Sequence, residues 1–97
     1  MRIEFSKPLE FENKKYSGID INVEAIKGKD IRNDVKSFKS LHGNDRIVQI
    51  LPYASIISRD DFIVYFAAKH AGVPEELIDE LPLADFNRVY TEVSGFF

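Results

Sequence analysis

The chain has 97 residues, which is the length of one small domain and leaves no room for two independent hydrophobic cores. Its composition is that of a globular protein, with 44% hydrophobic, 30% charged and 12% aromatic residues. Because cysteine is absent, the sequence excludes disulfides, thiolate metal sites and a cysteine nucleophile. We therefore expect a single domain that spans residues 1–97.

Charge is unevenly distributed along the chain. Residues 1–48 carry 10 Lys and Arg against 8 Asp and Glu, whereas residues 49–97 carry 3 against 8. The acidic second half disfavours a dedicated nucleic-acid-binding protein, since affinity for phosphates depends on many cations. The first residues lack the apolar core of a signal peptide, and no apolar stretch reaches the roughly 18 residues that span a bilayer. These features predict a cytoplasmic protein without a membrane partner.

Alternating apolar and polar residues at the start of the chain predict a β-hairpin over residues 2–23, with a polar turn at residues 12–15. Proline has no N–H to donate, so we expect the pairing at Pro8 to lie at a sheet edge or to be interrupted there. The alternating apolar positions are Ile3, Phe5, Leu9, Phe11, Ile19, Ile21 and Val23.

Helical periodicity begins at Lys29, where apolar residues recur along one face of a helix that should end near Gly43. These residues are Ile31, Val35, Phe38 and Leu41. The next segment, residues 46–57, is strongly apolar and divided by Pro52. Its pattern does not distinguish a buried strand from a short helix, so we expect an irregular apolar segment there.

Three further helices are predicted in the second half of the chain. Residues 59–70 are apolar on nearly all sides, which indicates a central helix, and Ser58 is expected to cap its N-terminus. A short helix follows over residues 75–80, and the last helix begins at Pro82. Its apolar face consists of Phe86, Val89, Tyr90, Val93 and Phe97. The predicted fold class is α+β, an N-terminal β-hairpin packed on a small bundle of three to four α-helices within residues 29–97.

The sequence offers little for catalysis or metal binding. Its two histidines, His42 and His70, stand near helix ends, where an imidazolium interacts favourably with the helix dipole. Paired carboxylates occupy first helical turns or exposed faces, and each of the five glycines is isolated, so no phosphate loop exists. We expect no enzyme activity, no cofactor and no metal.

A basic helix face suggests an alternative function, a small nucleic-acid-binding module that uses Lys29–Lys39. Arg32, Lys36 and Lys39 form one stripe at i, i+4 and i+7. Because Asp30 and Asp34 are interleaved with these cations, a solvated polar face is the preferred interpretation.

The chain holds more apolar residues than its predicted elements need for a core. We expect this surplus to bind a partner, in the manner of a groove that accepts a helix, or to mediate self-association. The candidate partner-binding residues are Ile47, Ile50, Leu51, Tyr53, Ile56, Ile57, Phe96 and Phe97.

Several short motifs follow one another in an order known from one family. The C-terminal third contains the run FAAKHAGVPEEL at residues 66–77 and LPLADF at residues 81–86, with the aromatic pair Phe96-Phe97 at its end. The first third contains LEF at residues 9–11, then Tyr16, IDI and GKD. In this combination the chain resembles the tail assembly chaperones of long-tailed bacteriophages, in particular the Mu-like group.

The resemblance implies a non-enzymatic protein that binds the helical tape measure protein and keeps it soluble during tail assembly. It also implies a longer form, made by ribosomal frameshifting, that recruits the tail tube protein. Such chaperones act in the cytoplasm of the bacterial host and are not retained in the finished virion. Codons for Gly95-Phe96-Phe97 can supply the run of uridines on which ribosomes slip.

Overall fold

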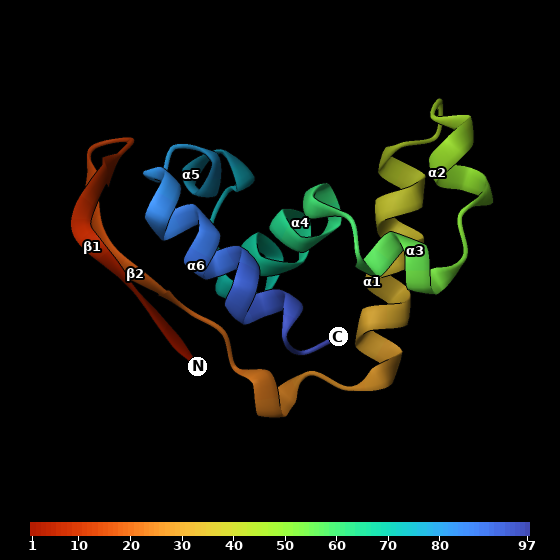
Figure 1. The fold of residues 1–97 in the computed structure, drawn as a ribbon, viewed down its shortest axis with the longest axis horizontal. Helices are drawn as coiled ribbons and strands as arrows, with labels where there is room; N and C mark the ends of the chain where they lie inside the picture. The colour runs from red at the N-terminus through yellow and green to blue at the C-terminus, as the bar shows by residue number, and fades with distance from the viewer.

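An antiparallel hairpin occupies the start of the chain in the computed structural model, which describes residues 1–97 (Figure 1). Strand β1 (Arg2–Phe11) pairs with β2 (Lys14–Asp20) through a two-residue turn. Glu12 and Asn13 form this turn with φ of 48° and 66°, the left-handed values that suit the twist of a hairpin. The predicted hairpin is confirmed, although it ends at Asp20 and a 3-10 turn, η1 (Val23–Ala25), takes the place of its last residues.

The hairpin is irregular at the predicted position. Glu4 pairs with Gly18 and Leu9 with Tyr16, so four residues of β1 lie opposite a single residue of β2. Pro8 belongs to this bulge, which confirms the expected interruption. The bulge turns Ser6 toward the helices, where it becomes an anchor described below.

Six α-helices follow the hairpin, and together the two parts confirm the α+β class. They are α1 (Gly28–Leu41), α2 (Arg46–Ile50), α3 (Tyr53–Ile57), α4 (Asp60–Ala71), α5 (Glu75–Asp79) and α6 (Leu83–Ser94). The number exceeds the predicted three to four because the segment expected to be irregular folds as two short helices. The side chain of Asp45 caps α2 by accepting from the amides of Ile47 and Val48, and Pro52 directly precedes α3.

Helix α4 is the centre of the molecule, as its apolar pattern predicts. Half of its 12 residues are buried, and Figure 1 shows α1 and α3 on one side of it and α5, α6 and the hairpin on the other. Rings on α4 join these parts: Phe62 contacts Phe38 of α1 edge-on at 5.5 Å, and Phe66 contacts Phe97 at 5.0 Å. The C-terminal residues therefore return to the core beside α1.

The prediction that Ser58 caps α4 is wrong. Ser58 ends α3 instead, and its hydroxyl donates to the carbonyl of Ser55 at 3.0 Å. Arg59 stands at the cap position without a side-chain cap, while the Asp61 carboxylate accepts both the Arg59 guanidinium and the amide of Phe62. Only two residues, Ser58 and Arg59, separate α3 from α4. Because Ser58 ends α3, it is not available to cap α4.

Candidate functional site

An apolar groove of about 450 Å³ brings together four of the eight predicted partner-binding residues. Ten residues line it and eight of them are hydrophobic. The four predicted residues are Tyr53, Ile57, Phe96 and Phe97. The structure thus brings together two regions that are far apart in the sequence, residues 53–57 and 96–97.

Each wall of the apolar groove comes from a different element. Helix α3 presents Tyr53 and Ile57, which are four residues apart and therefore lie on one helix face. The η1 segment contributes Val23, and α1 contributes Ile31 on the opposite side. The floor is Phe66 of α4, which is buried.

The two terminal phenylalanines differ in their roles. Phe97 is half-buried, and its ring packs on Phe66 and on Phe62, at 5.0 Å and 6.0 Å between centroids. Phe96 remains 43% exposed at the edge of the groove. Both terminal phenylalanines therefore line the groove. Of the two, Phe96 has the exposed ring that a partner can contact.

The groove continues along α1 as a second hollow of about 370 Å³. Gly28, Ile31 and Tyr53 line both spaces, and the second adds the exposed side chain of Arg32. We use "apolar groove" for the two together. Its lining is mainly apolar, with Lys27 in the first hollow and Arg32 in the second.

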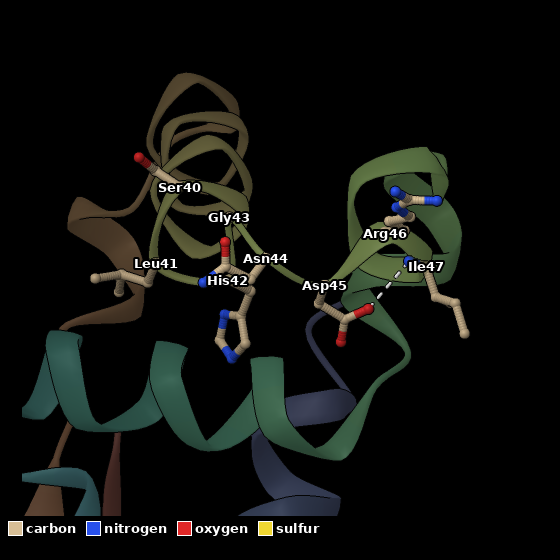
Figure 2. Close-up of a pocket in the computed structure, with 8 residues that line it drawn as sticks. All are labelled: Ser40, Leu41, His42, Gly43, Asn44, Asp45, Arg46 and Ile47. Carbon is tan, nitrogen blue, oxygen red and sulfur yellow. Dashed lines mark hydrogen bonds between the residues drawn. The ribbon is translucent and has the colours of Figure 1, made fainter.

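The predicted residues of α2 lie elsewhere. Ile47 and Ile50 are 64% and 80% exposed, near the turn between α1 and α2. The hollow at this turn, about 830 Å³ and lined by residues 40–47, is mostly polar. Figure 2 shows that Leu41 and Ile47 point in opposite directions, so these two exposed side chains do not form one apolar patch.

The other two predicted residues of this segment face inward. Ile56 is completely buried, so its assignment to a partner surface is wrong: it lies on the inner face of α3 and belongs to the core. Leu51 is half-buried against the core. A pattern of neighbouring isoleucines does not show which ones face the core when the helices are only five residues long.

The basic stripe on α1 is shorter than its sequence suggests. The Lys39 ammonium donates to the carbonyls of Gln49 and Leu51, at 3.3 Å and 2.7 Å, and so holds the end of α2. Lys29, Arg32 and Lys36 remain exposed, and none of them takes part in an ion pair.

A buried carboxylate on α1 was missed by sequence reasoning. Asp34 is 1% exposed, with one oxygen 2.5 Å from the Lys69 ammonium and the other 2.6 Å from Nε2 of His70. The hydrogen bond to Asp34 raises the pKa of Lys69 above its ordinary value of 10.5. The position of Asp34 on the apolar side of α1, between Ile31 and Phe38, was the available signal.

A second buried carboxylate anchors the hairpin. Asp85, in the first turn of α6, accepts the amide of Ser6 at 3.0 Å and its hydroxyl at 2.9 Å. Arg88, one turn further on, donates to the carbonyl of Glu4 at 2.7 Å. These contacts join β1 to α6, and Figure 1 shows both elements on the side of α4 away from α1 and α3.

No group of three or more His, Asp or Glu side chains is placed to hold a metal ion. None of the helices combines the length and apolar character needed to cross a membrane. Comparison with known protein families, curated proteins and solved structures finds no match. The candidate site is accordingly defined by the geometry of the apolar groove.

Proposed function

We propose that the chain is a bacteriophage tail assembly chaperone of the Mu-like type, which binds the tape measure protein and keeps it soluble without any enzymatic step. The observation that supports this proposal is the apolar groove, whose lining is mainly aromatic and aliphatic. The choice of family rests on the resemblance carried by the sequence motifs quoted above. The groove is the surface that would bind the tape measure protein.

The groove suits a helical client for a physical reason. Exposed apolar surface on a small protein is unfavourable unless a partner covers it, and Tyr53 and Phe96 are 44% and 43% exposed at its edges. An amphipathic helix offers an apolar ridge that such a groove can accept. A chaperone that covers these ridges would keep a long helical protein from aggregating before it is packed inside the tail tube.

The proposal includes the setting that the resemblance implies. The chain would act in the cytoplasm of the bacterial host and leave before the virion is complete. A frameshifted longer form would recruit the tail tube protein to the same client. A uridine-rich slippery run at the codons of Gly95-Phe96-Phe97, with an overlapping reading frame, is the expected feature of the gene.

The nucleic-acid-binding alternative is weaker. Of the stripe Lys29–Lys39, Lys39 is occupied by backbone carbonyls, which leaves three exposed cations on α1. Few phosphate contacts mean weak binding with a correspondingly shallow salt dependence. Salt-dependent retardation of duplex DNA that is abolished by Arg32→Ala would favour this alternative.

Co-expression tests the proposed function. The wild-type chain should solubilise and co-purify with the long helical protein encoded a few genes downstream. The double variant Tyr53→Asp/Phe96→Asp should lose this ability, because it places two charges at the edges of the apolar groove. Leu83→Asp is the matched control, since Leu83 is 75% exposed and lies outside the groove. An insoluble client in the presence of the wild-type chain would contradict the proposal.

A further inference from the structure

The apolar groove is built from helices and from a loop whose amides are already bonded. Its walls are η1, α1, α3 and the end of the chain, with no strand edge among them. In the loop, the amide of Ile26 donates to Val23 at 3.1 Å and that of Lys27 to the Asp30 carboxylate at 2.8 Å. An extended partner would find no strand edge to pair with here and would bury unpaired N–H and C=O groups. The occupant must therefore satisfy its own backbone, which a helix does.

Positive charge gathers along one wall of the groove. Lys27 lines the groove and Arg32 lines its continuation, and Lys36 follows Arg32 by one helical turn. All three are exposed, as is Lys29, and no ion pair neutralises any of them.

Carboxylates on the same elements balance this charge only in part. Asp30 is engaged by the backbone of Lys27, and Asp34 is buried against α4. Glu24 on η1 is exposed. The opposite wall, α3, consists of the uncharged residues YASII. The groove is thus apolar at its floor and basic on the α1 side only.

We propose that the apolar groove binds an amphipathic helix whose apolar ridge is flanked on one side by acidic residues, which face Lys27, Arg32 and Lys36. This inference rests on the proposed use of the groove as a binding site. Charges at the rim of an interface contribute modestly to affinity, but they select the partner and fix its orientation. Acidic side chains along one flank of the partner helix would pair with the cations on this wall.

Two labelled helical peptides test the charge preference. Both carry the same leucine ridge, and one has glutamates and the other lysines along a single flank. By fluorescence anisotropy, the glutamate peptide should bind about tenfold more tightly at low salt. The difference should shrink at about 0.5 M NaCl, where exposed charges are screened.

Charge-reversal variants assign the preference to α1. Arg32→Glu/Lys36→Glu should remove the preference for the glutamate peptide. Lys14→Glu/Lys15→Glu makes the same change in net charge at the distant hairpin turn, where both lysines are exposed, and should keep it.

Filling the groove tests its location. Gly28 lines both hollows, and a Cβ there would meet no atom within 4 Å, so Gly28→Trp introduces a large ring at the groove from an open backbone position. Its ring should occupy the groove and abolish peptide binding, while the circular dichroism spectrum stays that of the wild type. Asn33→Trp, an exposed position on α1 that lines neither hollow, should bind as the wild type does.

Three results would overturn the inference: equal affinity for the two peptides, a preference that survives Arg32→Glu/Lys36→Glu, or no binding of either peptide. Dimerisation in light scattering that the glutamate peptide does not reverse would also overturn it, because a second copy would then occupy the groove. Binding of the glutamate peptide without co-purification of the downstream protein would refute only the proposed function. Co-purification that is indifferent to the charge reversal would refute only this inference.

Discussion

Nε2 of His70 lies 2.6 Å from one carboxylate oxygen of Asp34, a side chain that is only 1% exposed. Lys69, the preceding residue of α4, approaches the other oxygen at 2.5 Å. A buried carboxylate is strongly unfavourable unless both oxygens have partners, and two consecutive residues of α4 supply them here. The His70 ring also packs on Phe66, the floor of the apolar groove, at 4.4 Å. The pair therefore fixes α1, one wall of the groove, against α4.

Replacing His70 by leucine should lower the free energy of unfolding by about 1–3 kcal/mol, because one buried oxygen of Asp34 loses its partner. Asp34→Ala removes the acceptor itself and leaves Lys69, whose side chain is 46% exposed, free to extend into water. Urea unfolding of the two single variants and the double variant measures the coupling. Effects that add to within about 0.5 kcal/mol would show that the hydrogen bond does not stabilise the fold.

Asp85→Ala should loosen the hairpin. The substitution leaves the amide of Ser6 without its acceptor, and we expect a loss of about 1–3 kcal/mol together with faster hydrogen exchange at that amide. Glu92→Ala, at an exposed position of α6 that takes part in no ion pair, is the control and should change neither quantity. Unchanged exchange at Ser6 in Asp85→Ala would contradict the proposed anchor.

Local pattern predicted those elements whose buried face repeats over several turns or strand positions. Val89 and Val93 are buried on α6 as the period of 3.6 requires, and Ile3 and Ile19 are buried on the hairpin as the period of 2 requires. Pro8 marked the interruption of the hairpin because a missing N–H is a property of the residue itself. Such features depend on neighbours in the sequence alone.

The buried and exposed positions of the apolar segment between α1 and α4 were harder to predict from the sequence. Its two helices have only five residues each and do not complete two turns, so no repeating buried face can be recognised. Ile50 is 80% exposed and Ile56 is fully buried, although both stand in similar apolar surroundings in the sequence. What separates them is contact with α1 and α4, which no local period contains. The groove has the same origin, since Tyr53 and Phe96 meet only after the chain has folded.

The Arg59–Asp61 ion pair makes stability depend on pH. Hydrogen bonding to Arg59 lowers the pKa of Asp61 below its ordinary value of 3.8, so the native state binds the proton less readily than the unfolded state. Its contribution is therefore present above about pH 3.8 and is lost as the pH falls further. Because both side chains are partly exposed, we expect Asp61→Asn to lower stability at pH 6 by only about 0.5 kcal/mol. The difference in melting temperature from the wild type should shrink progressively as the pH falls below about 3.8.

Glu75 should show the opposite pH dependence of stability to Asp61. Burial, with Glu76 and Asp79 nearby, raises the pKa of Glu75 above its ordinary value of 4.5, so its ionised form disfavours the native state. Glu75→Gln should raise the melting temperature at pH 7, and this gain should disappear below about pH 4.5, where both states are protonated. Parallel pH profiles for the wild type and both variants would contradict these assignments.

Two glycines should respond in opposite directions to alanine. Gly72 ends α4 with φ of 70°, and its amide bonds back to the carbonyls of Ala68 and Lys69. Only glycine adopts this left-handed conformation without strain, so Gly72→Ala should cost about 1 kcal/mol. Gly28 begins α1 with open space around the position of a Cβ, and Gly28→Ala should stabilise the chain by about 0.5 kcal/mol through the unfolded state. Urea unfolding measures both, and a Gly72→Ala variant as stable as the wild type would show that α4 can end without the left-handed residue.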